Sequence, residues 1–177
     1  IAKNVGCSKE KGKEVYENYF KAFTGLKSYY TKVMDATKNN GYIQFNPVTK
    51  RKFFISHDNP LIKYKYEEYL TPEEEREYRK SAAEIQRMSQ NFPIQGSSAD
   101  ISKLAGCYLF KEIVNRNWFN IVKIVNFVHD EFVVEAPEEL VKEVTTVLID
   151  CMKRAGSLFC KTIELDADAA IGDHWIH

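Results

Sequence analysis

At 177 residues, the chain is long enough to bury one substantial hydrophobic core, with room for a smaller second lobe. Its composition, 44% hydrophobic and 28% charged, is ordinary for a soluble globular protein, and it contains no repeats and no low-complexity tract. Because 25 basic residues balance 25 acidic ones, a polyanionic partner would have to meet a local basic patch rather than an overall positive charge.

The sequence shows neither a membrane pattern nor a disulfide pattern. No apolar run approaches about 18 residues, and the first residues lack the features of a signal peptide. The four cysteines are widely spaced and include no Cys-x-x-Cys pair, which favours reduced thiols over a zinc site or a disulfide framework. We therefore expect a cytoplasmic protein that does not enter a membrane. The sequence starts at Ile1, in helix-like residues, and we expect that further protein precedes it.

The first part of the chain predicts two helices and a hairpin. Ser8 is a suitable N-cap for the first helix, and Gly41 is a suitable stop for the second. Two short apolar runs, 42–45 and 52–55, predict a hairpin with a basic tip. That tip either contacts phosphates or blunts an edge strand, and the second interpretation is the simpler one. Residues 56–70 have no assignment.

The strongest helix signal is Thr71-Pro72-Glu73-Glu74. It combines an N-cap, a proline at the first helical position and a capping box. We expect this helix to end near Pro93, because proline lacks a backbone donor. A second capping-box pattern, from Ser97 to Asp100, predicts that the next helix starts there.

The second half of the chain predicts a central hairpin. Residues 121–128 are nearly continuously apolar and predict a deeply buried strand, whereas the alternation over 131–136 predicts a half-buried one. A helix over 137–156 and a last strand over 162–169 follow. Helices combined with antiparallel strands predict an α+β fold, with a helical lobe and a sheet backed by helices.

The turn of this hairpin, His129-Asp130-Glu131, has two interpretations. Aspartate is among the commonest turn residues, because its side chain bonds nearby backbone amides. A carboxylate at the end of a stiff hairpin can also hold a metal ion. For this segment alone, the turn interpretation is the simpler one. A second segment upstream favours the metal-binding interpretation instead.

The upstream segment reads Asn91-Phe92-Pro93-Ile94-Gln95-Gly96-Ser97-Ser98-Ala99-Asp100, with Arg87 before it. About thirty residues later the hairpin reads Val128-His129-Asp130-Glu131. In this order the two segments resemble the C-terminal part of family A DNA polymerases, the bacterial polymerase I and phage type. That family shows Arg, then Asn-x-Pro-x-Gln-Gly-(Thr/Ser)-x-Ala-Asp, then Val-His-Asp-Glu. Weaker matches at 1–30, at the Gly41-Tyr42 hairpin and at Gly172-Asp173-His174-Trp175 extend the resemblance over nearly the whole chain.

The resemblance implies a role for each matching residue. Asp130 would bind the catalytic Mg²⁺ ions, Glu131 would be a weaker contributor, and His129 would contact the primer end. The minor-groove side of the nascent base pair would be lined by Arg87, Asn91 and Gln95. These residue types suit that place, because minor-groove acceptors are shared by the base pairs and can be probed without reading sequence. Hard carboxylate oxygens suit Mg²⁺, which would activate the primer 3′ hydroxyl and steady the leaving pyrophosphate.

Two parts of the family pattern have no counterpart here. The second catalytic aspartate, on an Asp-x-Ser-x-(Ile/Leu)-Glu-x-Arg strand, and the nucleotide-binding fingers helix are both missing from this sequence. We therefore expect the C-terminal portion of a polymerase whose N-terminal part lies on another chain, and no polymerisation by this chain alone. The expected partners are primer–template DNA, a dNTP and that N-terminal part, in the cytoplasm of a bacterial or phage-infected cell.

The expected domains are 1–92, the C-terminal part of a fingers-like lobe, and 93–177, a palm-like lobe. Two other functions stay open. One is a non-catalytic nucleic-acid-binding or assembly module that keeps the same fold. The other is a stand-alone metal-dependent hydrolase built on Asp130 and Glu131, for which the sequence offers no evident third ligand.

Overall fold

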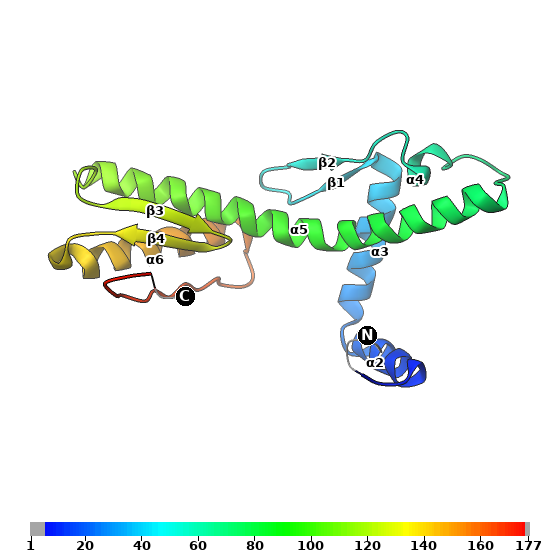
Figure 1. Ribbon diagram of the computed structural model, residues 1–177, viewed down its shortest axis with the longest axis horizontal. Helices are drawn as coiled ribbons and strands as arrows, with labels where there is room; N and C mark the ends of the chain where they lie inside the picture. Colours follow the sequence, from blue (N-terminus) through cyan, green and yellow to red (C-terminus); the bar gives the residue numbers. More distant parts are fainter. Residues whose placement is uncertain (1–5, 176–177) are drawn as a thin grey trace. The chain divides into compact units, whose positions relative to one another are not determined.

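The computed structural model describes residues 6–175, which contain helices and two separate two-stranded antiparallel sheets (Figure 1). This combination confirms the predicted α+β class. The elements in chain order are α2 (Lys9–Ala22), α3 (Thr24–Asn40), β1 (Tyr42–Gln44), β2 (Lys52–Phe54), α4 (Pro60–Lys63), α5 (Pro72–Asn115), β3 (Lys123–Val128), β4 (Glu131–Glu135), the 3₁₀ helix η1 (Glu138–Leu140) and α6 (Val141–Phe159). Over the described range, no helix is both long and apolar enough to cross a membrane.

The chain divides into two compact units. The first consists of the residues up to 44 together with 52–92, and the second of 45–51 together with the residues from 93 onward. The long helix α5 contributes its first part to the first unit and its remainder to the second. The loop between β1 and β2 belongs to the second unit, although both strands belong to the first.

In the first unit, α2 and α3 begin and end as the sequence predicts. The Ser8 hydroxyl accepts the backbone N–H of Lys11 at 3.2 Å, and α3 ends at Gly41, whose φ of 71° lies in the left-handed region that favours glycine. Within 56–70, α4 is capped by the side chain of Asn59. The buried core of the unit is formed by Ile55, Leu61 and Ile85.

The continuous helix α5 replaces the two helices predicted on either side of Pro93. Proline removes the bond that its N–H would make to the carbonyl of Ser89, a loss that typically costs about 3 kcal/mol. The hydrogen bonds and packing of the long helical segments on both sides of Pro93 offset this loss. Ser97 is an interior helix residue whose hydroxyl donates to the Pro93 carbonyl. The predicted stop at Pro93 and the predicted N-cap at Ser97 are therefore wrong.

In the second unit, α5, α6 and β4 surround a core of their own. The core consists of the buried residues Leu109, Ile113, Trp118, Val122, Val144, Val147 and Cys151. The side chain of Val134, on β4, packs against this core. The predicted half-buried strand after the turn is thereby confirmed as β4.

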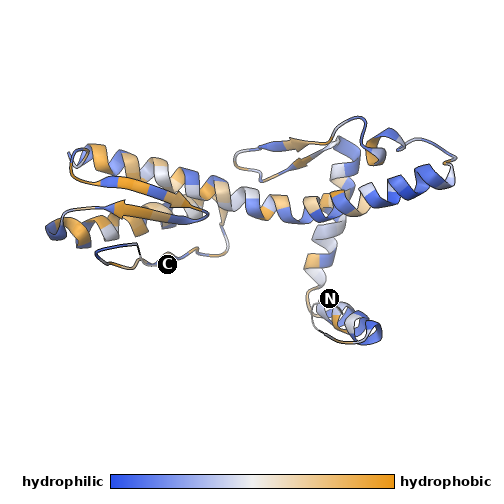
Figure 2. Cartoon of the chain, in the orientation of Figure 1, coloured by the Kyte–Doolittle hydropathy of each residue, from blue (hydrophilic) through white to orange (hydrophobic). Residues whose placement is uncertain are grey.

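The strand β3 differs from its prediction. The strand predicted over 121–128 is present as β3, but Ile124, Val125 and Phe127 are 36%, 53% and 41% exposed, so its predicted deep burial is wrong. Figure 2 shows the apolar character of β3 and of its partner strand. Within the described residues the sheet has two strands, which leaves apolar side chains of β3 uncovered. A β-bulge places Val125 between Ile124, which pairs with Val134, and Asn126, which pairs with Val133.

The strand predicted over 162–169 is also absent from the structure. This segment instead runs beside α6, where Lys153 lies 3.5 Å from Glu164 and 3.1 Å from Asp166. Leu165 lies so close to Gly156 that a Cβ added there would approach it to 3.0 Å. Alternating residues do not make a strand unless another strand offers its backbone donors and acceptors.

Candidate functional site

The turn between β3 and β4 brings three of the predicted site residues together. His129 and Asp130 form a two-residue loop, and Val128 pairs with Glu131 across its base. His129 has a φ of 54°, in the left-handed region, whereas Asp130 does not. These signs match a type II′ turn, in which glycine is preferred at the first position. A histidine there costs roughly 1–2 kcal/mol, a strain of the kind that often marks functional sites.

The loop is supported from below by aromatic packing. Phe127 and Phe132 are paired across the strands, and their rings stack with centroids 4.7 Å apart. The Phe132 ring also lies against Gly106 of α5, where an added Cβ would approach the ring to 3.1 Å. The hairpin end is therefore a firm base for the side chains that it presents.

The two carboxylates of the turn have different surroundings. Asp130 is exposed. Glu131 is partly buried, and its Oε1 accepts a hydrogen bond from the indole Nε1 of Trp175 at 2.7 Å. Trp175 belongs to the Gly172-Asp173-His174-Trp175 segment, so two of the motifs that carried the resemblance are in contact. This contact could not be deduced from sequence, because nothing in either segment specifies the other as its neighbour.

The donor chemistry of the turn suits a hard divalent cation. Mg²⁺ prefers oxygen ligands and often keeps several waters and substrate phosphates, so one or two protein carboxylates can suffice at such a site. Among the residues that the structure describes, no group of three His, Cys, Asp or Glu side chains is placed to hold a metal. The oxygen ligands of Asp130 and Glu131 therefore suit Mg²⁺, but two carboxylates are an incomplete set of ligands.

The other three predicted site residues lie on α5. Arg87, Asn91 and Gln95 follow one another at intervals of four, the spacing that repeats along one face of a helix. All three are exposed. No hydrogen bond or ion pair of the described residues occupies their side chains, so their polar groups are available to a ligand.

A polar network that the sequence did not reveal fixes the loop of residues 45–51. The Asp100 carboxylate accepts hydrogen bonds from Asn46 Nδ2 at 2.9 Å and from Thr49 Oγ1 at 2.8 Å, and pairs with Arg51 at 2.8 Å. Asp100, predicted as part of a capping box, is thus an anchor for a loop distant in sequence. The Gly96 carbonyl also accepts a bond from Arg51.

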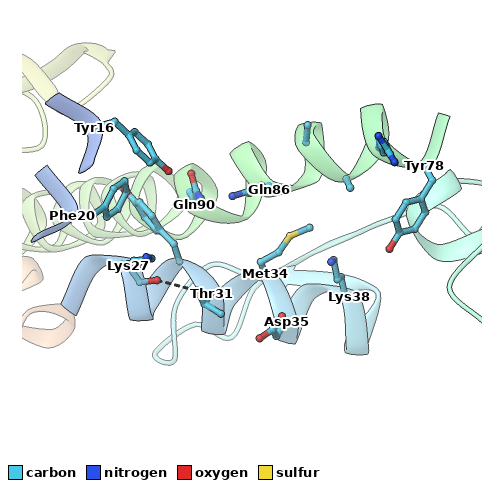
Figure 3. A pocket seen from close by; sticks show the side chains of 14 residues that line it. Tyr16, Phe20, Lys27, Thr31, Met34, Asp35, Lys38, Tyr78, Gln86 and Gln90 are labelled. Carbon is cyan, nitrogen blue, oxygen red and sulfur yellow. Dashed lines mark hydrogen bonds between the residues drawn. The ribbon is translucent and has the colours of Figure 1, made fainter. Parts of the chain in front are cut away.

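The first unit contains a cavity of about 470 Å³ (Figure 3). It is lined by α2, α3 and the first part of α5, and its polar edge includes Lys27, Lys38 and Asp35. Figure 3 shows the rings of Tyr16 and Phe20 at one end. None of the predicted site residues lines this cavity.

Comparison with known proteins gives a consistent result. The family model described as DNA polymerase family A matches residues 1–177. DNA polymerase I of Aquifex aeolicus is 28% identical over 171 residues, covering 97% of this chain and 25% of the relative. DNA polymerase I of Borreliella burgdorferi is 31% identical over 175 residues, covering 99% of this chain and 17% of the relative. The chain thus spans a quarter or less of the length of these relatives.

A solved structure agrees with the sequence relatives. The polymerase domain of Pol1 from M. smegmatis, in complex with DNA primer-template and dNTP, superposes with a TM-score of 0.67 at 27% sequence identity. The match covers 87% of this chain and 24% of that one. Since the family model spans the full sequence and the fold agrees, the chain belongs to DNA polymerase family A.

Proposed function

We propose that this chain forms part of the catalytic core of a template-directed DNA polymerase. The observation that carries the proposal is the hairpin end, where an exposed carboxylate, Asp130, follows the strained His129 on a firmly packed base. In this proposal residues 1–92 are the C-terminal part of a fingers-like lobe, and residues 93–177 are a palm-like lobe. The location proposed is the cytoplasm of a bacterial or phage-infected cell, in keeping with the bacterial relatives.

In this proposal each residue of the turn has a separate role at the reacting centre. Asp130 provides a carboxylate to the catalytic metal, and Glu131 provides a second negative charge beside it. His129 donates a hydrogen bond or contacts the sugar at the primer end. When bound, Mg²⁺ supplies Lewis-acid activation of the primer 3′ hydroxyl and neutralises phosphate charge.

The exposed row on α5 serves to hold the primer–template. Arg87, Asn91 and Gln95 offer donors that match the acceptors shared by base pairs in the minor groove. A correct pair presents those acceptors at regular positions, so side chains that probe them can sense its shape. Within residues 6–175, no hydrogen bond or ion pair involves the three side chains, which supports this role.

We further propose that the second catalytic aspartate and the nucleotide-binding helix are supplied by polypeptide outside this sequence, as a separate chain or otherwise. Two observations support this: the turn offers only two adjacent carboxylates, and apolar residues of β3 are uncovered. A strand bearing the missing aspartate would cover those residues and bring its carboxylate to the sheet. This chain alone would then not extend a primer.

Primer extension with Mg²⁺ tests the proposal in three arms: this chain alone, this chain with a polypeptide carrying the missing aspartate strand and fingers helix, and the same mixture with Asp130→Asn. Extension only in the second arm supports a two-metal polymerase that contains Asp130. Extension by this chain alone would show that the second carboxylate lies within this sequence. DNA binding without extension in any arm would favour a non-catalytic binding module, the alternative that the incomplete ligand set supports.

A further inference from the structure

Trp175 is the last residue that the structure describes. Its indole donates a hydrogen bond to the Glu131 carboxylate at the end of the hairpin. The 2.7 Å separation of Nε1 and Oε1 is short for an N–H···O bond, as is typical when the acceptor carries a charge. Trp175 is 46% exposed and can only donate, so this bond does not compensate for burial of the ring. Its direct effect is on the carboxylate, which it holds in one orientation.

The segment that brings Trp175 to this place is itself anchored. The Lys153 ammonium binds Glu164 and Asp166, and Leu165 packs onto Gly156 of α6. The Asp173 carboxylate also contacts the ring of its neighbour His174. The contacts to α6 thus fix residues 164–166, and the bond from Trp175 to Glu131 is a further attachment near the end of the same segment.

We infer that Trp175 is a positioning residue for the cation-binding carboxylates of the β3–β4 turn, an inference that rests on the proposed function. A glutamate side chain has three rotatable bonds and loses freedom when it is fixed. An indole N–H can occupy one oxygen without neutralising the charge, so it orients the Glu131 carboxylate beside Asp130. Trp175 thereby lowers the cost of assembling both carboxylates around one cation, without touching that cation.

The test is a Mn²⁺ titration of the ¹⁵N-labelled chain, followed by NMR. Mn²⁺ takes the same oxygen ligands as Mg²⁺ and broadens resonances near it. The chain has two tryptophans, and Trp118 is a buried core residue at 7% exposure, so its indole serves as an internal reference. In the wild-type chain we expect the Trp175 indole to broaden well before that of Trp118. Asp130→Asn should remove this difference.

The variant Trp175→Phe keeps a ring and removes the donor. We expect the Mn²⁺ concentration that half-broadens the Glu131 backbone amide to rise by roughly three- to tenfold, the effect of one lost hydrogen bond. Glu131→Asp draws the carboxylate away from the indole and should shift the titration in the same direction. Glu135→Gln alters an exposed carboxylate at the other end of β4 and should leave the titration unchanged.

Two outcomes would overturn the inference. If Trp175→Phe titrates like the wild type while Asp130→Asn does not, Trp175 only packs. If Mn²⁺ broadens no resonance of the turn selectively in the wild-type chain, the turn binds no cation that Trp175 could help to hold. The proposed polymerase function is decided separately, by primer extension in the assembled enzyme.

Discussion

Arg51 and Asp100 are paired at 2.8 Å and join the loop of residues 45–51 to helix α5. The Asp100 side chain is 8% exposed and also accepts bonds from Asn46 and Thr49. A carboxylate with three partners is a strong anchor, because removing it leaves several donors without an acceptor.

Asp100→Ala should therefore lower the free energy of unfolding by about 1–3 kcal/mol, the usual cost of leaving buried polar groups unsatisfied. Urea unfolding followed by circular dichroism measures this change. Asp150→Ala alters an exposed aspartate of α6 and should stay within about 0.5 kcal/mol of the wild type. Equal effects of the two substitutions would mean that the network contributes nothing beyond surface charge.

Gly96→Ala should destabilise the second unit. An added Cβ would lie 2.6 Å from two carbons of the Phe45 ring, which is itself held by Arg51 at 4.4 Å. Overpacking of this kind costs about 1–3 kcal/mol, and the thermal midpoint should fall accordingly.

The matched control is Gly25→Ala, in α3, where nothing lies within 4 Å of the added carbon. Alanine should stabilise that helix by up to about 1 kcal/mol, so the two Gly→Ala changes have opposite signs. A second change, Phe45→Ala, should relieve part of the Gly96→Ala defect. If Gly96→Ala proves neutral, Phe45 moves aside freely.

His129→Gly separates strain from function. Glycine adopts a φ of 54° without the penalty that histidine bears, so the substitution should leave stability unchanged or raise it by up to about 1 kcal/mol. In the assembled polymerase, the same change should slow primer extension, because the proposed contact to the primer end is lost. A variant that loses stability instead would show that the histidine side chain supports the turn.

Arg87→Ala and Gln95→Ala should weaken primer–template binding by about 1–3 kcal/mol each. The effect on folding should be small, because both side chains are exposed and neither makes a hydrogen bond or ion pair with the rest of the described chain. Fluorescence anisotropy with labelled DNA and the assembled enzyme measures the affinity. Lys103→Ala removes another exposed charge of α5 and serves as the control. Full affinity and full mismatch discrimination in both variants would refute the proposed minor-groove role.

The attachment of 162–169 to α6 should weaken in acid. A hydrogen bond from the Lys153 ammonium holds the pKa of Asp166 below its ordinary value of 3.8. A lowered carboxyl pKa gives a contribution that is present above the unfolded-state pKa and is lost as the pH falls through the folded-state one. As the pH falls through the folded-state pKa of Asp166, the NMR chemical shifts of the amides near Leu165 should therefore move toward their unstructured values, and Asp166→Asn should reduce this pH dependence.

Local signals in the sequence predicted local structure well. Both halves of the capping box at the start of α5 are present, since the Thr71 N–H bonds Glu74 Oε2 at 2.8 Å and the Glu74 N–H bonds Thr71 Oγ1 at 3.3 Å. The Gly41 stop and the hairpin around His129 and Asp130 follow from residues a few positions apart. Each of these features depends on short-range chemistry that a single segment contains.

The failures share a different cause. Continuation of α5 through Pro93 depends on the length of helix on both sides, and the lack of a strand at 162–169 depends on which elements flank it. The contacts of Asp100 with Arg51 and of Trp175 with Glu131 join segments that no local pattern links. The site residues were predicted from family motifs, whereas their contacts with neighbouring side chains are known only from the structure.

The β-bulge at Val125 adds one residue to β3 before the turn. Side chains alternate from one side of a strand to the other, so each residue between the bulge and the turn reverses which way the next one points. Paired residues present their side chains on the same face, so deletion of Val125 would leave the pairs from Asn126 and Val133 to Val128 and Glu131 in register. Deletion of a residue between Val125 and the turn would shift those pairs and turn the side chains next to His129 to the other face. Insertions and deletions between the bulge and the turn should thus be selected against more strongly than exchanges of one side chain for another.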